Sequence, residues 1–446
     1  MQCRCTSRRL LPLVLMALFG FPSGASATDE ALLQVLLQNK LITRQQYAAL
    51  AKKPDPAVNV TLKDGIKLKS VDGTSQAQVG VYFQYDAAAY SEDGTTDFSN
   101  GSELRRGRLS VAGTVLSDWD YKLELDFAGA TQGGSTNTVS VTDAYLRWMG
   151  LRPWAVTAGN FKVPFSMEAV GSGKYSTFME RGLPFAFLNL RRLGGMVSTN
   201  GDNWSAAAGL FGDTVTSQSG NDEGQSAAGR LTWAPFFGTD RVLHLGIAAA
   251  RVQPAQAASS GMKTVRFRSK PESNIISDGL TESATLTANG RTLGRSSGRL
   301  VDSGNIPGGV NDYILLGAEA AAVYGPASLQ GEYIDVTVDR DTGGDLSFSG
   351  YYLFGSWFLT GESRNYKADR GIFDIIQPKR PFSLKDGGWG AWEVAVRFSS
   401  IDLTDGRVAG GVENDVTAGI NWYPTAYTRL MVNYVDVLKV SGGAHD

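Results

Sequence analysis

The sequence predicts an all-β fold, a transmembrane antiparallel β-barrel of about 16 strands with a short N-terminal helical segment. Segments with an apolar residue at every second position recur from Val58 toward the end of the 446-residue chain. Beyond residue 27 no stretch reaches the 18 or more apolar residues of a membrane helix. The 53 glycines and the 10% of aromatic residues also favour a barrel, which needs many turns and two aromatic girdles.

The first 27 residues predict a secretory signal peptide. They combine a basic start, an apolar stretch and a small-residue cleavage site, namely Arg4, Arg8 and Arg9, residues 10–21, and residues 25–27. The alternative, a membrane anchor, is disfavoured because about a dozen apolar residues are too few to span a bilayer. We therefore expect a mature chain from Thr28.

Cleavage constrains the chemistry of the mature chain. It removes Cys3 and Cys5, the only two cysteines, which excludes a disulfide framework, a thiolate metal site and a cysteine nucleophile. It also removes three arginines and no acid, which leaves 39 Lys+Arg against 44 Asp+Glu. This mildly acidic balance argues against nucleic-acid binding, whereas solute preference depends on where the charges lie.

Residues 28–56 are predicted to form a periplasmic helical or coiled-coil segment. Leucines recur at helical spacing from Leu32 to Leu37, and Thr43 can cap a second short helix. Pro54 and Pro56 then end the helical pattern. We expect a helical hairpin that helps trimer assembly rather than one that binds a ligand.

From residue 57 to residue 446 the pattern predicts the barrel itself. Strand-like segments place apolar residues on one face and polar or charged residues on the other. Four charges on one strand face, as at Asp120, Lys122, Glu124 and Asp126, do not fit a dry sandwich core. The clearest apolar faces are Ala77, Val79, Val81, Phe83 and Tyr85; Trp119, Tyr121, Leu123, Leu125 and Phe127; Leu243, Leu245, Ile247 and Ala249; and Trp392, Val394, Val396 and Phe398.

The strands are expected to be joined alternately by short turns and long loops, and a closed barrel of this size leaves an aqueous channel. The predicted short joins are residues 116–118, 150–153 and 423–425. The predicted long joins are residues 161–193, 253–311 and 365–388. A loop as long as residues 161–193 is usually functional or disordered. In a pore we expect it to fold into the lumen and narrow the channel.

The sequence gives little support to an enzyme, and it predicts no cofactor and no metal site. Only two histidines occur. His445 is next to the end of the chain, and His244 lies on a predicted strand without a catalytic signature. A lumen-facing or packed role is the better interpretation of His244.

Cations that line a narrow passage can replace the hydration that an anion loses there. Arg106 and Arg108 share the predicted polar face of one strand, whereas Arg105 is expected to point to the opposite face unless the strand begins after it. A second group, Lys263, Arg266, Arg268 and Lys270, has alternate spacing. It is either a ladder for anions or a face that contacts solvent or lipopolysaccharide.

Several motifs resemble the phosphate-selective porin O/P family, in the family's order and over most of the mature chain. The matching stretches are ELRRGRLSVAGTVLSDWDYKLELDFAG, VTDAYLRW, GNFKVPFSMEAVGSGKYSTFMER, FRSKPES, RLVDSGNI and GAWEVAVRFSSIDL. The resemblance implies a homotrimer of 16-stranded barrels in the bacterial outer membrane, in contact with lipid and lipopolysaccharide. Each barrel would take up inorganic phosphate, polyphosphate or other small anions.

The resemblance also implies roles for individual residues. Arg105 and Arg106 match the family's paired arginines, and Arg266, Arg268 and Lys270 match its arginine ladder, with lysine at the last position. Asp143 matches an acid near the constriction, and Ser172 and Lys174 match the infolded loop. The predicted solute-binding residues are therefore Arg105, Arg106, Arg108, Asp143, Lys162, Ser172, Lys174, Arg266, Arg268 and Lys270.

Two departures from the family pattern bear on selectivity. Ala169 stands where phosphate-specific members have lysine in the loop, and Val81 stands where they have arginine in the first strand. Lys162 or Lys174 could compensate. The chain also ends at His445 and Asp446 without a terminal aromatic strand, which we interpret as a missing last strand.

The sequence therefore predicts a pore for small anions, and the resemblance implies that the solutes are phosphate or polyphosphate. One alternative is a general-diffusion porin with little phosphate specificity. A second is a non-transport barrel such as an adhesin or an enzyme, and a soluble periplasmic β-protein is disfavoured because it would leave the signal peptide and aromatic-rimmed strands unexplained.

Overall fold

A computed structural model of the chain describes residues 27–50, 58–62, 65–91, 100–128, 139–215, 222–256, 261–275, 285–288, 291–294 and 298–442. The predicted signal peptide, apart from Ala27, and His445 lie outside these ranges. The chain forms two compact units, divided after Val58. None of the described helices is long and apolar enough to span a membrane.

The helical elements are α1 (Ala27–Gln38), α2 (Arg44–Leu50), α3 (Met167–Val170) and the 3-10 turns η1 (Gly173–Tyr175) and η2 (Leu183–Phe187). The strands up to the longest connection are β1 (Val58–Thr61), β2 (Ile66–Ser70), β3 (Gln76–Ala88), β4 (Gly101–Val115), β5 (Trp119–Asp126), β6 (Ser140–Leu151), β7 (Trp154–Lys162), β8 (Arg191–Asn200), β9 (Trp204–Phe211), β10 (Gln225–Phe237) and β11 (Arg241–Gln253). The later strands are β12 (Arg268–Ser269), β13 (Thr285–Ala288), β14 (Arg291–Gly294), β15 (Val301–Asp302), β16 (Val310–Tyr324), β17 (Ala327–Arg340), β18 (Leu346–Phe358), β19 (Tyr366–Lys367), β20 (Ile372–Phe373), β21 (Ala391–Asp405), β22 (Val408–Thr425) and β23 (Thr428–Ser441).

The first unit contains the predicted helical hairpin. Helices α1 and α2 contact each other, and Thr43 caps α2 as the sequence indicates. The Thr43 hydroxyl oxygen accepts from the Gln46 backbone N–H at 3.1 Å, and the Gln46 side-chain oxygen accepts from the Thr43 N–H at 2.9 Å. This reciprocal capping box satisfies two N–H groups that a helix start leaves unpaired.

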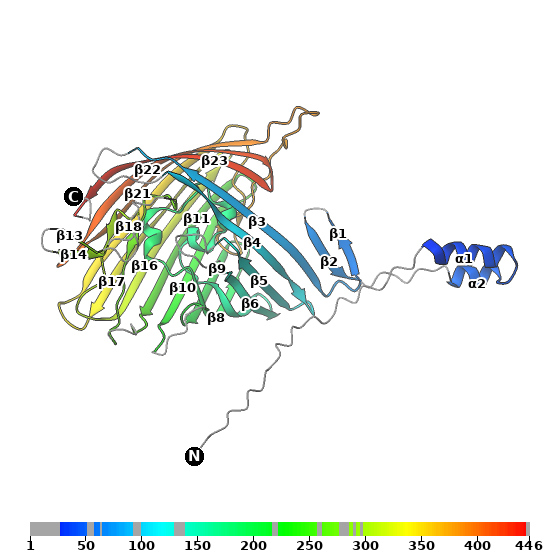
Figure 1. The fold of residues 1–446 in the computed structure, drawn as a ribbon, viewed down its shortest axis with the longest axis horizontal. Helices are drawn as coiled ribbons and strands as arrows, with labels where there is room; N and C mark the ends of the chain where they lie inside the picture. The colour runs from blue at the N-terminus through cyan, green and yellow to red at the C-terminus, as the bar shows by residue number, and fades with distance from the viewer. Residues whose placement is uncertain are drawn as a thin grey trace, which may run out of the picture. The chain divides into compact units, whose positions relative to one another are not determined.

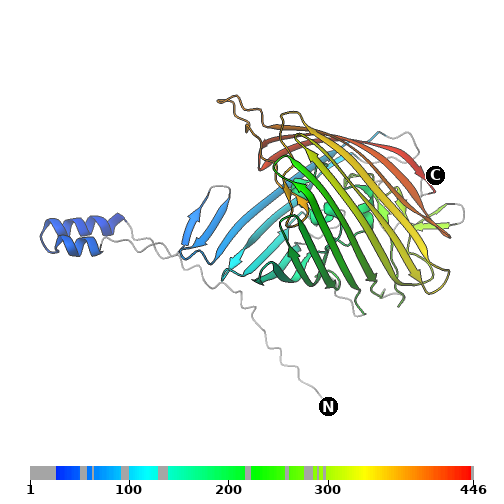
Figure 2. The same ribbon diagram turned by 180° about the vertical axis from the view of Figure 1, so that it is seen from behind.

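The second unit is one antiparallel sheet that curves around an interior (Figures 1 and 2). Fifteen long strands, β3 to β11, β16 to β18 and β21 to β23, pair in chain order, and the shorter β2 pairs antiparallel with β3. This agrees with the predicted number of about 16 strands. In the described residues, β23 pairs with β22 alone.

The two faces of the sheet meet different surroundings, as the alternation predicts. In β5, Trp119 and Leu123 are 42% and 46% exposed, whereas Glu124 and Asp126 are buried. The same alternation appears in β3, where Phe83 and Tyr85 are exposed. Apolar side chains therefore point outward and polar ones point inward, as in a strand between lipid and a polar lumen.

The expected alternation of short turns and long loops holds only in part. Strands β4 and β5 are joined by residues 116–118 and β6 and β7 by residues 152–153, but β22 continues to Thr425, so its turn is residues 426–427. Residues 341–345 make the β17–β18 join short. Because neighbouring strands are antiparallel, the long loop Leu359–Gly390 leaves the sheet at the same end as the short turns. The Ser363 hydroxyl in this loop donates to the carbonyl of Gly325, which lies in the short β16–β17 turn, at 2.5 Å.

The lumen is not polar throughout, which the sequence pattern did not indicate. On the inner faces of β16 to β18 and β21, apolar side chains pack against apolar residues of two long loops. The cluster includes Leu315, Ile334, Val336, Phe348 and Ile401 from the strands and Phe165, Leu183, Phe187, Phe267 and Ile306 from the loops. These contacts fill part of the interior, and buried polar residues such as Glu332 and Arg397 lie on the same strands.

Gly159 lies where the backbones of β6 and β7 approach closely. Its φ is +131°, and a Cβ would lie 2.2 Å from the Ala144 carbonyl oxygen. We expect Gly159→Ala to lower the free energy of unfolding by about 1–3 kcal/mol, measured as the urea midpoint in detergent micelles. Gly195→Ala is the control, because its Cβ would meet nothing closer than 4.0 Å. Equal midpoints for the two variants would contradict this packing.

Candidate anion-binding site

The long loop Val163–Leu190 folds inside the curved sheet, as predicted from its length. Its backbone and side chains bond to strands that lie far apart along the sheet. The anchoring contacts are Arg105 Nε to Glu180 Oε1 (2.6 Å), Glu332 to the N–H groups of Met167 (3.1 Å) and Glu168 (2.8 Å), Asn421 Nδ2 to the Thr177 carbonyl (2.8 Å) and the Met179 N–H to Asn433 Oδ1 (2.8 Å). The loop is therefore a fixed part of the inner wall.

A β-bulge corrects the prediction for Arg105. Strand β4 already begins at Gly101, yet Arg105 and Arg106 both point inward. Gln84 pairs with Arg106 and Tyr85 with Leu104, so Arg105 is an extra residue in β4. Such a bulge breaks the strict alternation of side chains. Arg105 consequently reaches the loop, whereas Arg106 and Arg108 face the space beside it.

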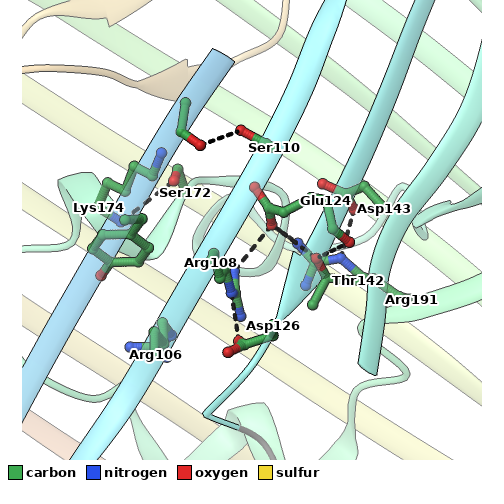
Figure 3. A network of polar contacts seen from close by, with 12 residues as sticks. Arg106, Arg108, Ser110, Glu124, Asp126, Thr142, Asp143, Ser172, Lys174 and Arg191 are labelled. Atoms are coloured by element: carbon green, nitrogen blue, oxygen red, sulfur yellow. Dashed lines mark hydrogen bonds and ion pairs between the residues drawn. The ribbon is translucent and has the colours of Figure 1, made fainter. Parts of the chain in front are cut away.

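Carboxylates neutralise one set of inner-wall cations (Figure 3). Arg108 Nε donates to Asp126 Oδ2 at 2.6 Å and its guanidinium also reaches Glu124. Asp143 accepts from Lys122 at 2.5 Å and from Arg191 at 2.6 Å. These ion pairs link β4, β5, β6 and β8 into one network.

Uncharged groups hold a second set of cations. Arg106 donates to the Gln84 side-chain oxygen, and Lys162 Nζ donates to the carbonyls of Val170 (3.0 Å) and Gly171. No ion pair joins Arg106 or Lys162 to an acid within the described residues. Both side chains are therefore fixed in place by neutral partners, and no ion pair in the described part of the chain offsets them.

Two further cations of this second set come from the loop. Arg181 Nε donates to the Glu168 carbonyl at 3.0 Å, and Lys174 Nζ lies 5.2 Å from the centre of the Tyr82 ring. Burial lowers the pKa of Arg181 to about 10 and also lowers the pKa of Lys174. Burial costs both side chains hydration, which an incoming anion can replace.

The two sets of cations share one cavity of about 510 Å³. Ten of its lining residues are Arg or Lys and four are Asp or Glu, so positive charge is in excess. The lining includes Arg106, Arg108, Asp143, Lys162, Ser172 and Lys174 from the predicted set. It also includes Lys122, Glu124, Arg147, Arg181, Arg191 and Arg230, together with Asp369, Arg370 and Asp374 from the loop Leu359–Gly390.

The remaining predicted residues lie elsewhere. Arg105 binds Glu180 in the loop; burial alone would raise the pKa of Glu180, but the Arg105 guanidinium holds it below its usual range. Arg266 donates to Asp302 at 2.7 Å, Arg268 lies in β12, and Lys270 Nζ donates to the Asn274 carbonyl at 2.9 Å. These three line a different part of the protein from the cavity.

Lys122 and Arg191 are the main cavity residues that the sequence reasoning did not select. Lys122 shares the charged face of β5 with three acids, which indicates an inward side chain, but its ion-pair partner Asp143 lies on the next strand. Arg191 begins β8, and nothing near it in the sequence indicates its contact with Asp143.

Of the two residues that depart from the family's cationic pattern, Val81 and Ala169, only Ala169 lies in the interior. Val81 is 57% exposed and faces outward, so it cannot occupy the lumen position of a cation. Tyr82 is its inward neighbour. Ala169 is buried in α3, inside the infolded loop, so its small side chain does lie where a longer cation would alter the interior.

His244 is packed, as the sequence analysis favoured. It is fully buried, with Nε2 3.0 Å from Glu319 Oε1 and Nδ1 2.6 Å from the Tyr366 hydroxyl. Arg230 binds the same Glu319 carboxylate. This cluster attaches the loop Leu359–Gly390 to the wall. Among the described residues, no group of three or more His, Cys, Asp or Glu could hold a metal ion.

Comparisons with known proteins agree with this architecture. The chain is 25% identical over 418 residues to Porin O of Pseudomonas aeruginosa, and the match covers 88% of this chain and 90% of that protein. It is 30% identical over 344 residues to an uncharacterized protein of Caulobacter vibrioides, covering 75% of this chain. The chain spans 62% of that relative's length.

Two solved structures are similar at low sequence identity. An anion-selective porin from Comamonas acidovorans gives a TM-score of 0.48 at 15% identity, covering 83% of this chain and 93% of that chain. The outer-membrane protein OmpT of Vibrio cholerae gives 0.47 at 12% identity, covering 82% and 88%.

The family model described as phosphate-selective porin O and P matches residues 77–439. This range contains all fifteen long strands, except the first residue of β3 and the last two of β23, and the whole candidate site. The chain belongs to the phosphate-selective porin O and P family of the bacterial outer membrane.

Proposed function

We propose that the chain forms an outer-membrane pore in which small anions pass through the cavity beside the infolded loop, with phosphate or polyphosphate as the preferred solutes. The observation that carries this proposal is the excess of cations in the cavity, ten against four acids. Family membership supports a channel rather than an enzyme. The name of the relative Porin O agrees with this function.

The way in which the cations are held favours passage over trapping. Arg106 and Lys162 are held by an amide and by carbonyls, so within the described residues no ion-paired acid competes with an anion for either side chain. Arg108 shares its charge with Asp126 and Glu124 and attracts an anion less strongly. Several moderate sites let an ion enter and also leave.

The loop adds donors that suit an oxyanion. Lys174 is the middle residue of η1, and the Ser172 hydroxyl oxygen accepts from the Lys174 backbone N–H at 3.3 Å. This leaves the Ser172 O–H able to donate. A hydroxyl, an ammonium and the Arg106 guanidinium together offer the dispersed donors that a phosphate needs.

A general-diffusion porin is the second candidate, and the ion-pair network favours it. Asp143 neutralises part of Lys122 and Arg191, and Ala169 supplies no charge to the loop. If these effects dominate, the pore would prefer anions weakly and would not bind phosphate.

We also propose that the chain forms a homotrimer in contact with lipopolysaccharide, as expected for the family. Cross-linking in isolated outer membranes tests the first point: a ladder that ends at three subunits supports it, and a monomer alone contradicts it.

Single-channel recording in a planar bilayer separates the two candidate pores. We expect reversal potentials in chloride gradients that indicate anion preference, together with a decrease in chloride current as phosphate is added. Anion preference without phosphate block would support the general-diffusion porin. The absence of channels from a correctly inserted protein would contradict both.

Arg106→Gln is expected to reduce the anion preference. The substitution removes a charge that faces the cavity but keeps a side chain able to bond to Gln84. A unit charge at about 4 Å contributes about 1 kcal/mol even in water, so the anion-to-cation permeability ratio should fall roughly fivefold. The measurement is the reversal potential in a potassium chloride gradient.

Arg152→Gln is the matched control for Arg106→Gln. Arg152 lies in the β6–β7 turn, its side chain is 64% exposed and it does not line the cavity. It should leave the reversal potential unchanged. The same shift in both variants would mean that net charge, and not the cavity, sets selectivity.

We expect the anion preference of the pore to depend on pH through Lys174. Because burial lowers the pKa of Lys174 below the ordinary 10.5, this amine loses its charge at a lower pH than other lysines. Anion preference should therefore decline as the pH rises from 7 to 10. Lys174→Arg keeps its charge in this range, so its reversal potential should change less. Identical pH profiles would exclude Lys174 from selectivity.

A further inference from the structure

The outward face of β16 forms an apolar trough. Its outward positions Ala318, Ala320 and Ala322 are small, and larger side chains flank them at every register position except Gly331. The register pairs are Ile247, Leu245 and Leu243 of β11 on one side and Tyr333, Gly331 and Leu329 of β17 on the other. The alanines thus form the floor and the large side chains form the walls.

The trough is large enough for a hydrocarbon chain. It encloses about 860 Å³ and extends to Leu353 and Tyr351 of β18. From Ala318 to Ala322 the strand advances roughly 13 Å, close to half the thickness of a bilayer core of about 30 Å. Its length therefore matches an acyl chain from one leaflet.

Arg241 lies at the foot of the trough. It is exposed, pairs in register with Tyr324 and stacks its guanidinium 5.0 Å from the centre of that ring. Tyr324 is 69% exposed and is the next outward residue after Ala322. Arg241 makes no ion pair within the described part of the chain.

The opposite end of β11 provides a contrast. Arg251 is also outward-facing, but it donates to Asp312 at 2.6 Å. Its charge is therefore matched within the protein. Ten residues separate the two arginines, so the strand spans roughly the thickness of the bilayer between them. Among the described residues of β11, Arg241 is therefore the outward arginine that has no ion-paired acid.

Aromatic residues place Arg241 at headgroup depth. Trp233, Phe236 and Phe237 on β10 and Tyr324 on β16 are all exposed near the same end of the sheet. Aromatic side chains gather at the boundary between hydrocarbon and headgroups. The short turn 238–240 next to Arg241 indicates the periplasmic side, because short turns face the periplasm in bacterial barrels.

We propose that this trough binds a glycerophospholipid of the periplasmic leaflet. One acyl chain lies along Ala318, Ala320 and Ala322, and the phosphate diester contacts the Arg241 guanidinium. The apolar floor and the cation at its foot match the two parts of such a lipid. A second copy of the chain would cover the trough equally well, but it would not account for the cation.

Native mass spectrometry of the detergent-solubilised full chain tests the site. Dioleoylphosphatidylglycerol is titrated as the probe, and dioleoylglycerol, which lacks the phosphate, serves as the reference. We expect the phospholipid to bind more tightly than the reference. Arg241→Gln should weaken its binding roughly fivefold, the contribution of one arginine near an anionic lipid. Equal binding to wild type and Arg241→Gln would overturn the phosphate contact.

Filling the trough tests the acyl-chain contact. Ala320→Leu should weaken binding of both lipids, whereas Ala208→Leu should not, because Ala208 is an exposed alanine of β9 outside the trough. Arg251→Gln should also bind as the wild type does. If Ala320→Leu changes the number of subunits but not lipid binding, the trough is an interface between copies and the proposal is wrong. Channel conductance shows that each variant is folded.

Discussion

The attachment of the infolded loop to the inner wall is the interaction on which the rest of the site depends. Bonds from β4, β17, β22 and β23 hold Val163–Leu190 on several sides. Because every contact is buried or partly buried, water cannot readily replace it. The loop thus packs apolar side chains against part of the wall and also borders the cationic cavity. Without it, Lys174 and Arg181 would have no fixed position.

The sequence predicts most of the fold because a membrane strand leaves a strong pattern. Its two faces meet different solvents, so apolar and polar residues must alternate, and β5 shows this clearly. The exceptions occur where another segment replaces the solvent. Ile334 and Val336 are apolar although they point inward, because they pack against a loop. The alternation of residues along a strand does not predict that contact.

The site is less predictable than the fold for a related reason. Arg106, Arg108 and Lys174 could be selected because their local spacing or the family resemblance marks them. The contacts of Arg191 and Lys122 with Asp143 join residues from three strands, and such pairings depend on register. A single extra residue changes the register, as Arg105 shows.

The extra residue in β4, Arg105, also places two inward-pointing arginines at the same height in the wall. In a regular strand, inward side chains are separated by two residues, or roughly 7 Å. A regular β4 would therefore offer either a tether for the loop or a charge for the solute at this height. The bulge supplies both at once: Arg105 binds Glu180, and Arg106 lines the cavity through which we propose that anions pass. Consecutive residues thereby support the loop and place a cation on the cavity wall.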